Sequence, residues 1–205
     1  TGWYPHVRGH RTLWHCLRTD EPNTLKYLKQ AGYNVQWVGK NDLLSPESMA
    51  DSVSHVHDWG WVDSGCTRPE PGDPHHQSFL FGPMSVDPTD KHQVDSAIRF
   101  IRSWKPGDAP YMLFIAIGQP HCPYTVPEPW YSMVDPDSLP SLTAAELPDK
   151  PDFYTLIRAS RDLDKLPDYE LRRIMAVYLG MVSYVDHLLG TVLDALDEAG
   201  QADDT

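Results

Sequence analysis

The feature that most constrains the fold is an apolar run without alternation, Y-M-L-F-I-A-I over residues 111–117. Alternating apolar and polar residues are typical of a strand with one face in water, whereas an unbroken apolar run is typical of a strand buried on both faces. Such strands occur in parallel sheets that helices cover on both sides. The run therefore predicts an α/β fold with a mostly parallel sheet covered by helices.

A helix is expected directly before this strand, from about residue 90 to residue 104. Asp90 and Gln93 have the spacing of a capping box, and the apolar residues that follow recur at helical intervals. Helix followed by buried strand is the order that an α/β layered fold requires.

The same order occurs earlier in the chain. A short helix is expected over residues 20–32, with Asp20 as its cap, and a strand over 35–38 follows it and ends at Gly39. A long helix is expected over 168–199. Its apolar positions keep helical spacing and are predicted to form its buried stripe: Leu171, Ile174, Met175, Tyr178, Val182, Val185, Leu189, Val192 and Leu196.

Composition excludes several classes of protein. A length of 205 residues suits one α/β domain or one lobe of a larger one. The chain has 29 acidic and 17 basic residues and a formal charge of −12, which makes it a poor general binder of nucleic acid. No apolar run approaches the roughly 20 residues of a membrane span, so none is expected. Cys16, Cys66 and Cys122 are too widely spaced for a metal knuckle. Three free thiols are expected, and one disulfide, Cys16–Cys66 or Cys66–Cys122, is the alternative.

Proline is unusually frequent, with 19 residues against a usual share of about 5%. We expect most of residues 41–88 and 118–151 to be irregular loops. These loops are also where substrate specificity is expected to lie, because binding residues concentrate on loops that a rigid scaffold positions.

Polar side chains follow both expected strands. Lys40 and Asp42 come directly after the first strand, and His121 follows the second. In parallel α/β folds, ligands bind beyond the carboxyl ends of the strands. A lysine offers a full positive charge to a bound oxyanion, and a histidine can protonate a leaving group near neutral pH. These residue types are also common on solvated surfaces, so the pattern alone is a weak signal.

Four segments, in order, resemble the sulfatase family of the alkaline phosphatase superfamily. They are T-G-W-Y-P-H with G-H-R (residues 1–11), A-G-Y leading to V-G-K (31–40), the apolar strand with P-H-C-P-Y (111–124), and Y-L-G-M-V with V-D and G (178–190). The resemblance covers the whole chain. It implies that residues 1–205 are the middle of one sulfatase catalytic domain, with its nucleophile and first metal segment before residue 1 and its last metal-ligand segment after residue 205.

The resemblance also implies a reaction. Family members hydrolyse sulfate esters with a formylglycine nucleophile, made from a cysteine or serine in a C/S-x-P-x-R motif, and with a calcium ion held by acidic side chains. Lys40 matches the family's sulfate-binding lysine, and His121 matches the histidine of its P-H-x-P block. Both are therefore expected to be catalytic and substrate-binding. Fixed cations of this kind stabilise the charge that develops on the sulfuryl and leaving oxygens.

The sequence departs from the family pattern in three respects. The family often has G-K-W-H-L-G where this chain has G-K-N-D-L-L, so the carboxylate of Asp42 stands where a histidine usually contacts substrate. Asp42 would repel a sulfate unless it pairs with a cation, binds a metal or holds a substrate hydroxyl. None of the three cysteines lies in a C-x-P-x-R motif, and the calcium ligands are expected outside the chain. We therefore expect the 205 residues alone to be inactive.

Alternatives stay open at this stage. Asp42 keeps hydrolysis of a phosphodiester or a phosphonate monoester possible on the same fold. A relative that binds sulfated glycans without catalysis is a third reading. The expected partner is thus a sulfated small molecule or carbohydrate. His10 and Arg11, next to the expected nucleophile turn, either buttress that turn or reach substrate.

Overall fold

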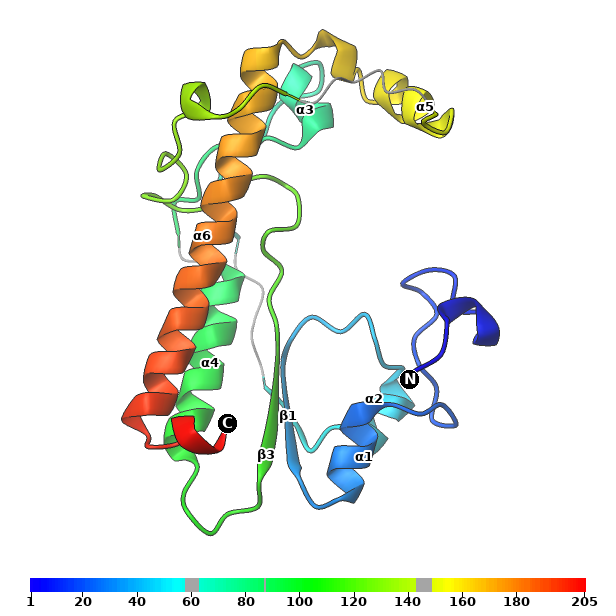
Figure 1. Cartoon of the computed structure of the whole chain (residues 1–205), viewed down its shortest axis with the longest axis vertical. Helices are drawn as coiled ribbons and strands as arrows, with labels where there is room; N and C mark the ends of the chain where they lie inside the picture. The colour runs from blue at the N-terminus through cyan, green and yellow to red at the C-terminus, as the bar shows by residue number, and fades with distance from the viewer. Residues whose placement is uncertain (58–62, 87, 143–148) are drawn as a thin grey trace. The chain divides into compact units, whose positions relative to one another are not determined.

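A computed structural model describes residues 1–57, 63–86, 88–142 and 149–205. The expected loops 41–88 and 118–151 therefore fall partly outside the described residues. Within the described chain (Figure 1), the elements are, in order, η1 (Pro5–Arg8), α1 (Thr24–Gln30), β1 (Asn34–Gly39), α2 (Pro46–Ser52), β2 (His55–His57), α3 (Pro74–Ser78), α4 (Thr89–Ser103), β3 (Tyr111–Ala116), η2 (Pro136–Ser138), α5 (Phe153–Ser160), η3 (Leu163–Lys165), α6 (Asp168–Glu198) and η4 (Ala202–Asp204).

The chain divides into two compact units. The first consists of residues 1–61, 89–118 and 191–205, and the second of residues 62–88 and 119–190. The sheet lies in the first unit, and most of α6 lies in the second.

The sheet of the first unit has three parallel strands in the order β2-β1-β3. β1 is central and pairs with β3 along its whole length, from Asn34 opposite Tyr111 to Gly39 opposite Ala116. Parallel neighbours need crossover connections, and here they contain α4 and α2. The predicted α/β fold with a parallel sheet is confirmed.

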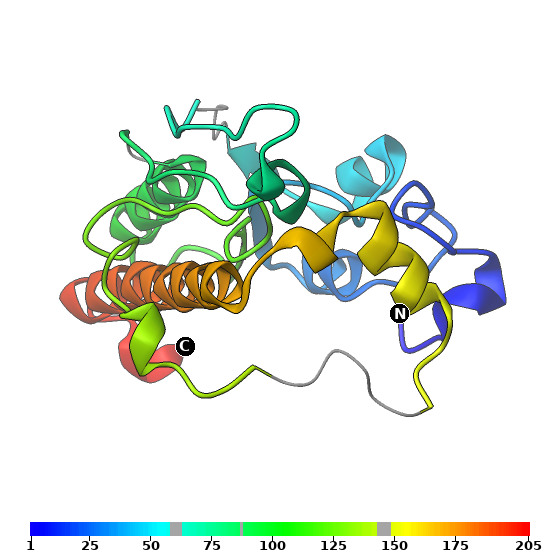
Figure 2. The same cartoon turned by 90° about the horizontal axis from the view of Figure 1, so that it is seen from above.

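Helices cover both faces of this sheet (Figures 1 and 2): α1 and α2 lie on one side, and α4 lies on the other. Val35 and Trp37 of β1 pack with Leu25 of α1 in a buried cluster, and the Trp37 indole stacks on Phe114 of β3. Because successive side chains of a strand point to opposite faces, Val38 faces the side of α4. Both faces of β1 are buried in consequence.

One strand prediction is wrong in its burial. The run 111–117 does form β3, but every residue of β3 is only partly buried. By contrast, β1 is buried at every residue after Asn34. The physical reason is position: β1 has a strand on each side, whereas among the described residues β3 has a strand partner on one side only.

The helix boundaries differ from the prediction at two caps. α1 begins at Thr24, and its cap is Asn23, whose side chain accepts a hydrogen bond from the Lys26 N–H. Asp20 is not the cap, because it lies four residues before the helix and pairs with Arg8 at 3.3 Å.

The expected capping box of α4 is also absent. Asp90 lies inside the helix, where its buried carboxylate accepts a hydrogen bond of 3.0 Å from the Gly118 N–H. This contact ties the first turn of α4 to Gly118, two residues beyond the end of β3. Asp90 therefore stabilises the loop after β3 and does not cap the helix.

The loops contain more regular structure than expected. Within residues 41–88 the chain forms α2, β2 and α3, and within 118–151 it forms the short η2. Proline misled the prediction because it also suits the first turn of a helix, where its missing N–H costs nothing. Pro46 and Pro74 both occupy this position.

The long helix is confirmed as α6, and Gly200 beyond its end has the left-handed φ of +67° that a helix C-terminus favours. Its buried face is not the predicted stripe. Val192 and Leu196 are buried, whereas Met175, Val182 and Leu189 are exposed. The helix is apolar on more than one side, so its periodicity alone does not identify the packed face.

α6 also passes a test for a membrane span by length and composition, with 39% of its most apolar window buried. One such helix is weak evidence for a membrane span, because core helices of soluble proteins have the same length and composition. Among the described residues α6 alone passes it. The absence of a membrane span stays a prediction.

Candidate functional site

The carboxyl end of β1 is a tightly built turn. Gly39 has a φ of +100°, and a Cβ at this residue would lie 2.5 Å from the Ala116 carbonyl oxygen and 3.0 Å from the Gln93 Oε1. Only glycine fits such an approach of two strands in this backbone conformation. The indole Nε1 of Trp37 donates a 3.0 Å hydrogen bond to the Gly39 carbonyl, which fixes the residue before Lys40.

Asn41 orders the residues that follow. Its Oδ1 accepts hydrogen bonds from the N–H groups of Leu43 and Leu44, at 3.0 and 2.9 Å, and its Nδ2 donates to the Leu44 carbonyl at 2.7 Å. An asparagine side chain that binds its own backbone in this way replaces a regular turn. The loop 40–44 is therefore shaped by Asn41 at the position where the family often has tryptophan.

The structure brings two of the expected site residues together. The Lys40 Nζ lies 2.9 Å from the Asp42 carboxylate, and both side chains are exposed. The carboxylate thus pairs with a cation, one of the three ways in which it could be compatible with an anionic substrate. The pair as a whole has no net charge.

His121 belongs to the second unit and is described within it. Its Nδ1 donates a hydrogen bond to the Cys122 carbonyl at 2.5 Å, since a carbonyl can only accept. In the neutral ring this leaves Nε2 as an acceptor on an exposed side chain. The segment is held by neighbouring backbone, because the Tyr124 N–H donates to the Phe79 carbonyl and the Phe81 N–H donates to the Tyr124 carbonyl.

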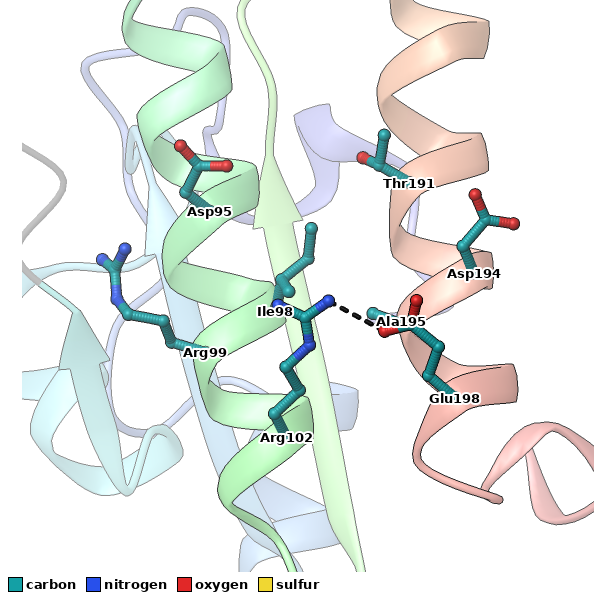
Figure 3. Close-up of a pocket in the computed structure, with 8 residues that line it drawn as sticks. All are labelled: Asp95, Ile98, Arg99, Arg102, Thr191, Asp194, Ala195 and Glu198. Carbon is teal, nitrogen blue, oxygen red and sulfur yellow. Dashed lines mark hydrogen bonds and ion pairs between the residues drawn. The ribbon is translucent and has the colours of Figure 1, made fainter.

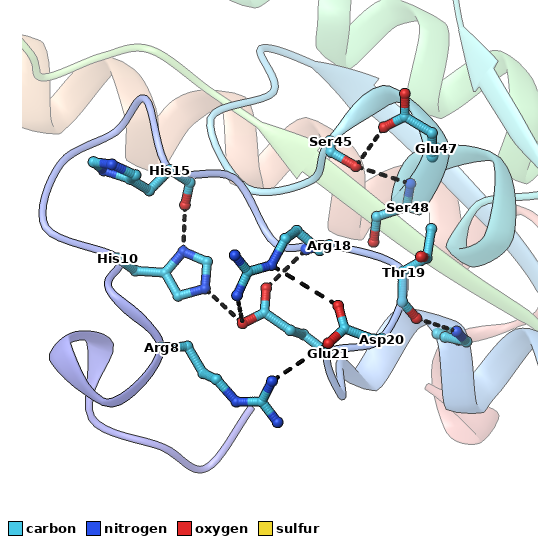
Figure 4. A network of polar contacts seen from close by, with 11 residues as sticks. Arg8, His10, His15, Arg18, Thr19, Asp20, Glu21, Ser45, Glu47 and Ser48 are labelled. Atoms are coloured by element: carbon cyan, nitrogen blue, oxygen red, sulfur yellow. Dashed lines mark hydrogen bonds and ion pairs between the residues drawn. The ribbon is translucent and has the colours of Figure 1, made fainter.

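Sequence reasoning missed a polar network in the first unit (Figure 4). Glu21 is only 2% exposed, and its carboxylate accepts hydrogen bonds from the Arg18 N–H at 2.8 Å and from the His10 Nε2 at 2.8 Å. The His10 Nδ1 lies 2.5 Å from the His15 carbonyl. Both ring nitrogens of His10 thus face acceptors, an arrangement that the doubly protonated imidazolium satisfies.

The contacts of this network raise the pKa of His10 and lower the pKa of Glu21. The hydrogen bond to Glu21, and then that to the His15 carbonyl, raise the pKa of His10 above its ordinary value. Burial alone would raise the pKa of Glu21, but the hydrogen bonds from the Arg18 N–H and from His10 outweigh it, and its pKa lies below the ordinary value. The side chains of His10, Arg18 and Glu21 follow no sequence motif with a fixed spacing. Their contacts could therefore not be predicted from a local pattern.

The described residues of the first unit line at least two hollows. One, of about 430 Å³, lies between α4 and the last turns of α6 (Figure 3) and is lined by acidic and basic side chains, among which Arg102 pairs with Glu198 at 2.8 Å. The other, of about 370 Å³, is lined by Arg8, His10, Trp14, His15, Cys16, Arg18, Ser45 and Pro46.

The described residues do not provide a metal centre. No group of three or more His, Cys, Asp or Glu side chains among them is close enough to hold a metal ion. The calcium ion that the resemblance implies therefore does not fit the residues around Lys40 or His121, and we derive no step through it. Cys16, Cys66 and Cys122 are free thiols.

Comparison with known proteins identifies the class of this chain. The fold is shared with the phosphonate monoester hydrolase SpPMH from Silicibacter pomeroyi, with a TM-score of 0.62 and 24% identity over 93% of this chain and 46% of that one. This is the fold of the alkaline phosphatase superfamily and its sulfatases. The Sulfatase family model matches residues 1–205, and the chain belongs to the sulfatase family.

Curated relatives agree with this assignment. A sulfatase of Formosa agariphila is 28% identical over 203 residues, which cover 88% of this chain and 39% of the relative. Human iduronate 2-sulfatase is 27% identical over an alignment of 210 residues, gaps included. The match covers 88% of this chain and 38% of the relative. The chain thus spans about two fifths of the length of these relatives.

Proposed function

We propose that this chain is part of one sulfatase catalytic domain that hydrolyses a sulfate ester. Membership in the family supports the reaction class. The observation that carries the assignment of residues is the loop at the end of β1, which presents Lys40 with Asp42 at 2.9 Å on a backbone that Gly39 and Asn41 shape. A sulfate ester has one negative charge, and the ammonium group of Lys40 offers it three donors.

Within this proposal the residues have distinct roles. Lys40 binds non-bridging sulfate oxygens, and Asp42 holds the ammonium group in place until substrate arrives. The imidazolium form of His121, protonated on both ring nitrogens, donates a proton to the leaving oxygen from Nε2, the nitrogen that its backbone contact leaves available. The proposal includes a calcium ion and a formylglycine nucleophile, which residues outside this chain would supply. The 205 residues alone would therefore release no sulfate.

A phosphonate monoester or a phosphodiester is the alternative substrate. Like a sulfate ester, each has a single negative charge, and the uncharged Lys40–Asp42 pair does not discriminate among them by charge. The relative turnover of an aryl sulfate and an aryl phosphonate monoester by the full-length protein separates the two reactions. Binding of a sulfated glycan without any turnover would instead favour the non-catalytic reading.

The roles are tested by substitution in the full-length protein. Lys40→Ala should lower kcat/KM for 4-nitrophenyl sulfate by about 100-fold, the effect expected when a charged donor to the transition state is lost. Lys165→Ala is a matched control, because Lys165 is equally exposed (69% against 68%) and also pairs with an aspartate, at 3.1 Å. Equal effects of the two substitutions would refute the role of Lys40.

His121→Gln has a more specific signature. An alkyl sulfate has a poor leaving group that needs a proton, whereas 4-nitrophenolate leaves without one. The substitution should therefore reduce turnover of an alkyl sulfate by about 100-fold or more and that of 4-nitrophenyl sulfate far less. Equal losses on both substrates would show that His121 is not the proton donor.

A further inference from the structure

The first nineteen residues contrast in charge with the rest of the chain. They include Arg8, Arg11 and Arg18, three histidines and no acidic residue, whereas the whole chain has a formal charge of −12. Two of these arginines line the hollow of about 370 Å³ described above. Basic side chains therefore line this hollow, as in sites that attract anions, and the carboxylates of Asp20 and Glu21 pair with them from beside it.

Asp20 and Glu21, the two acidic residues beside this hollow, do not occupy every N–H group of its two arginines. Asp20 lies 3.3 Å from the Arg8 Nη1, and the other guanidinium N–H groups of Arg8 have no hydrogen-bond partner among the described residues. Glu21 is buried and accepts hydrogen bonds from His10, from the Arg18 N–H and from the Arg18 Nη2, the last at 3.3 Å. The Arg18 Nε lies 3.8 Å from Asp20, and the Arg18 Nη1 has no hydrogen-bond partner among the described residues. A guanidinium can bind a carboxylate or a sulfate through two parallel N–H groups.

An aromatic ring lies at the same hollow. The Trp14 side chain lines it and is 91% exposed. An exposed indole next to cationic groups offers an apolar face to a sugar ring and excludes water from charged contacts nearby.

The hollow adjoins the Lys40 loop, because backbone hydrogen bonds join the segment around Leu17 to the end of that loop. Leu17 pairs with Leu44: the Leu17 N–H donates to the Leu43 carbonyl at 2.8 Å, and the Ser45 N–H donates to the Leu17 carbonyl at 2.9 Å. Ser45 lines the hollow and is three residues from Asp42, so the two Cα atoms are at most about 11 Å apart. A disaccharide can span that separation.

We propose that this hollow, with Arg8, Arg18 and Trp14, binds a second anionic group of a saccharide substrate while Lys40 binds the sulfate that is cleaved. The substrate class is then a saccharide with at least two anionic groups, the second being a sulfate or a uronate carboxylate. The inference rests on the proposed function for the position of the cleaved sulfate, but binding of the second anion can be measured independently.

The test is calorimetric titration of the full-length protein with three disaccharides, which have one sulfate, two sulfates, or one sulfate and one carboxylate. The wild type should bind at least one of the doubly charged sugars about tenfold more tightly than the singly charged one, the effect of one further charge-assisted contact. The preferred sugar identifies the second group as sulfate or carboxylate.

Arg8→Gln should abolish this preference, and Arg8→Lys should retain part of it, because the charge is kept and the fork is lost. Arg102→Gln is the matched control: Arg102 is an exposed arginine paired with Glu198, and the substitution should leave the preference intact. Equal binding of all three sugars by the wild type, or equal effects of the Arg8 and Arg102 substitutions, would overturn the proposal.

Separate measurements distinguish a failure of the proposed sulfatase reaction from a failure of the proposed second anion site. Wild-type turnover of 4-nitrophenyl sulfate tests the sulfatase reaction alone, because that ester has no second anionic group. Turnover without a preference for doubly charged sugars would keep the proposed function and reject the second site. A preference without turnover would keep the second site and reject the reaction.

Discussion

The imidazole Nε2 of His10 lies 2.8 Å from the buried carboxylate of Glu21. Eleven residues of chain separate the two, and the contact ties the N-terminal segment to the residues before α1. Together with the Arg18 N–H and the Arg18 Nη2, which both donate to Glu21, it compensates the charge of a buried carboxylate.

The His10–Glu21 contact predicts a pH-dependent stability. Because the folded-state pKa of His10 is raised, its contribution is present below about pH 6.5 and is lost as the pH rises through the folded-state value. Because the pKa of Glu21 is lowered, its contribution is present above about pH 4.5 and is lost as the pH falls through the folded-state value. The difference in melting temperature between wild type and His10→Gln should therefore be largest between these limits.

Thermal melting from pH 4 to pH 9 checks this expectation. The comparison of the two proteins cancels other titrating groups, such as His57, whose pKa is lowered by burial and then by His55 and Arg99. A difference in melting temperature that grows with pH above neutrality would contradict the assigned contact.

The turn before Lys40 predicts a pair of glycine substitutions with different costs. Gly39 and Gly107 both have a φ of +100°, but a Cβ at Gly39 would collide with Ala116, whereas Gly107 has open space. Gly107→Ala should cost about 1 kcal/mol of unfolding free energy from backbone strain alone, and Gly39→Ala should cost about 3 kcal/mol or more. Urea denaturation measures both, and equal costs would show that the close approach of the strands is relieved elsewhere.

The α6 helix offers a second matched pair. A Cβ at Gly180 would lie 2.1 Å from the Trp130 carbonyl oxygen, whereas at Gly190 nothing lies within 4 Å. Gly190→Ala should stabilise the protein by about 1 kcal/mol, because alanine favours a helix interior over glycine. Gly180→Ala should instead destabilise it by about 2 kcal/mol or more. A higher melting temperature for both variants would mean that the Trp130 segment can move away from the helix.

Asn41 is predicted to be a positioning residue for Lys40. Asn41→Ala removes three hydrogen bonds from the loop 40–44 and should lower kcat/KM for 4-nitrophenyl sulfate about tenfold, mainly through KM. Asn41→Asp keeps the acceptor that binds two N–H groups and should recover most of the loss. Asn23→Ala, which removes the cap of α1, controls for destabilisation.

If Asn41→Ala and Asn23→Ala change the melting temperature alike and also change KM alike, Asn41 has only a structural role. A recovery by Asn41→Asp in KM but not in melting temperature would separate positioning from stability.

The main elements follow from local sequence patterns. The strand over 34–39, the strand over 111–116 and the helices α4 and α6 were each predicted close to their observed bounds, because periodicity and turn residues act within a few positions. The family resemblance added the expectation for Lys40 and His121, whose roles are still predictions.

What the sequence alone determined is the fold class, the order of the main elements α1, β1, α4, β3 and α6, and the polar residues that follow β1 and β3. Only the tertiary structure decided which strand is central, which face of α6 is buried, and which partners Asp90 and Glu21 find. Asp90 binds Gly118 across 28 residues, and Glu21 binds His10 across 11. Such contacts depend on how separate segments pack, and a buried carboxylate accepts whichever donors that packing brings within reach.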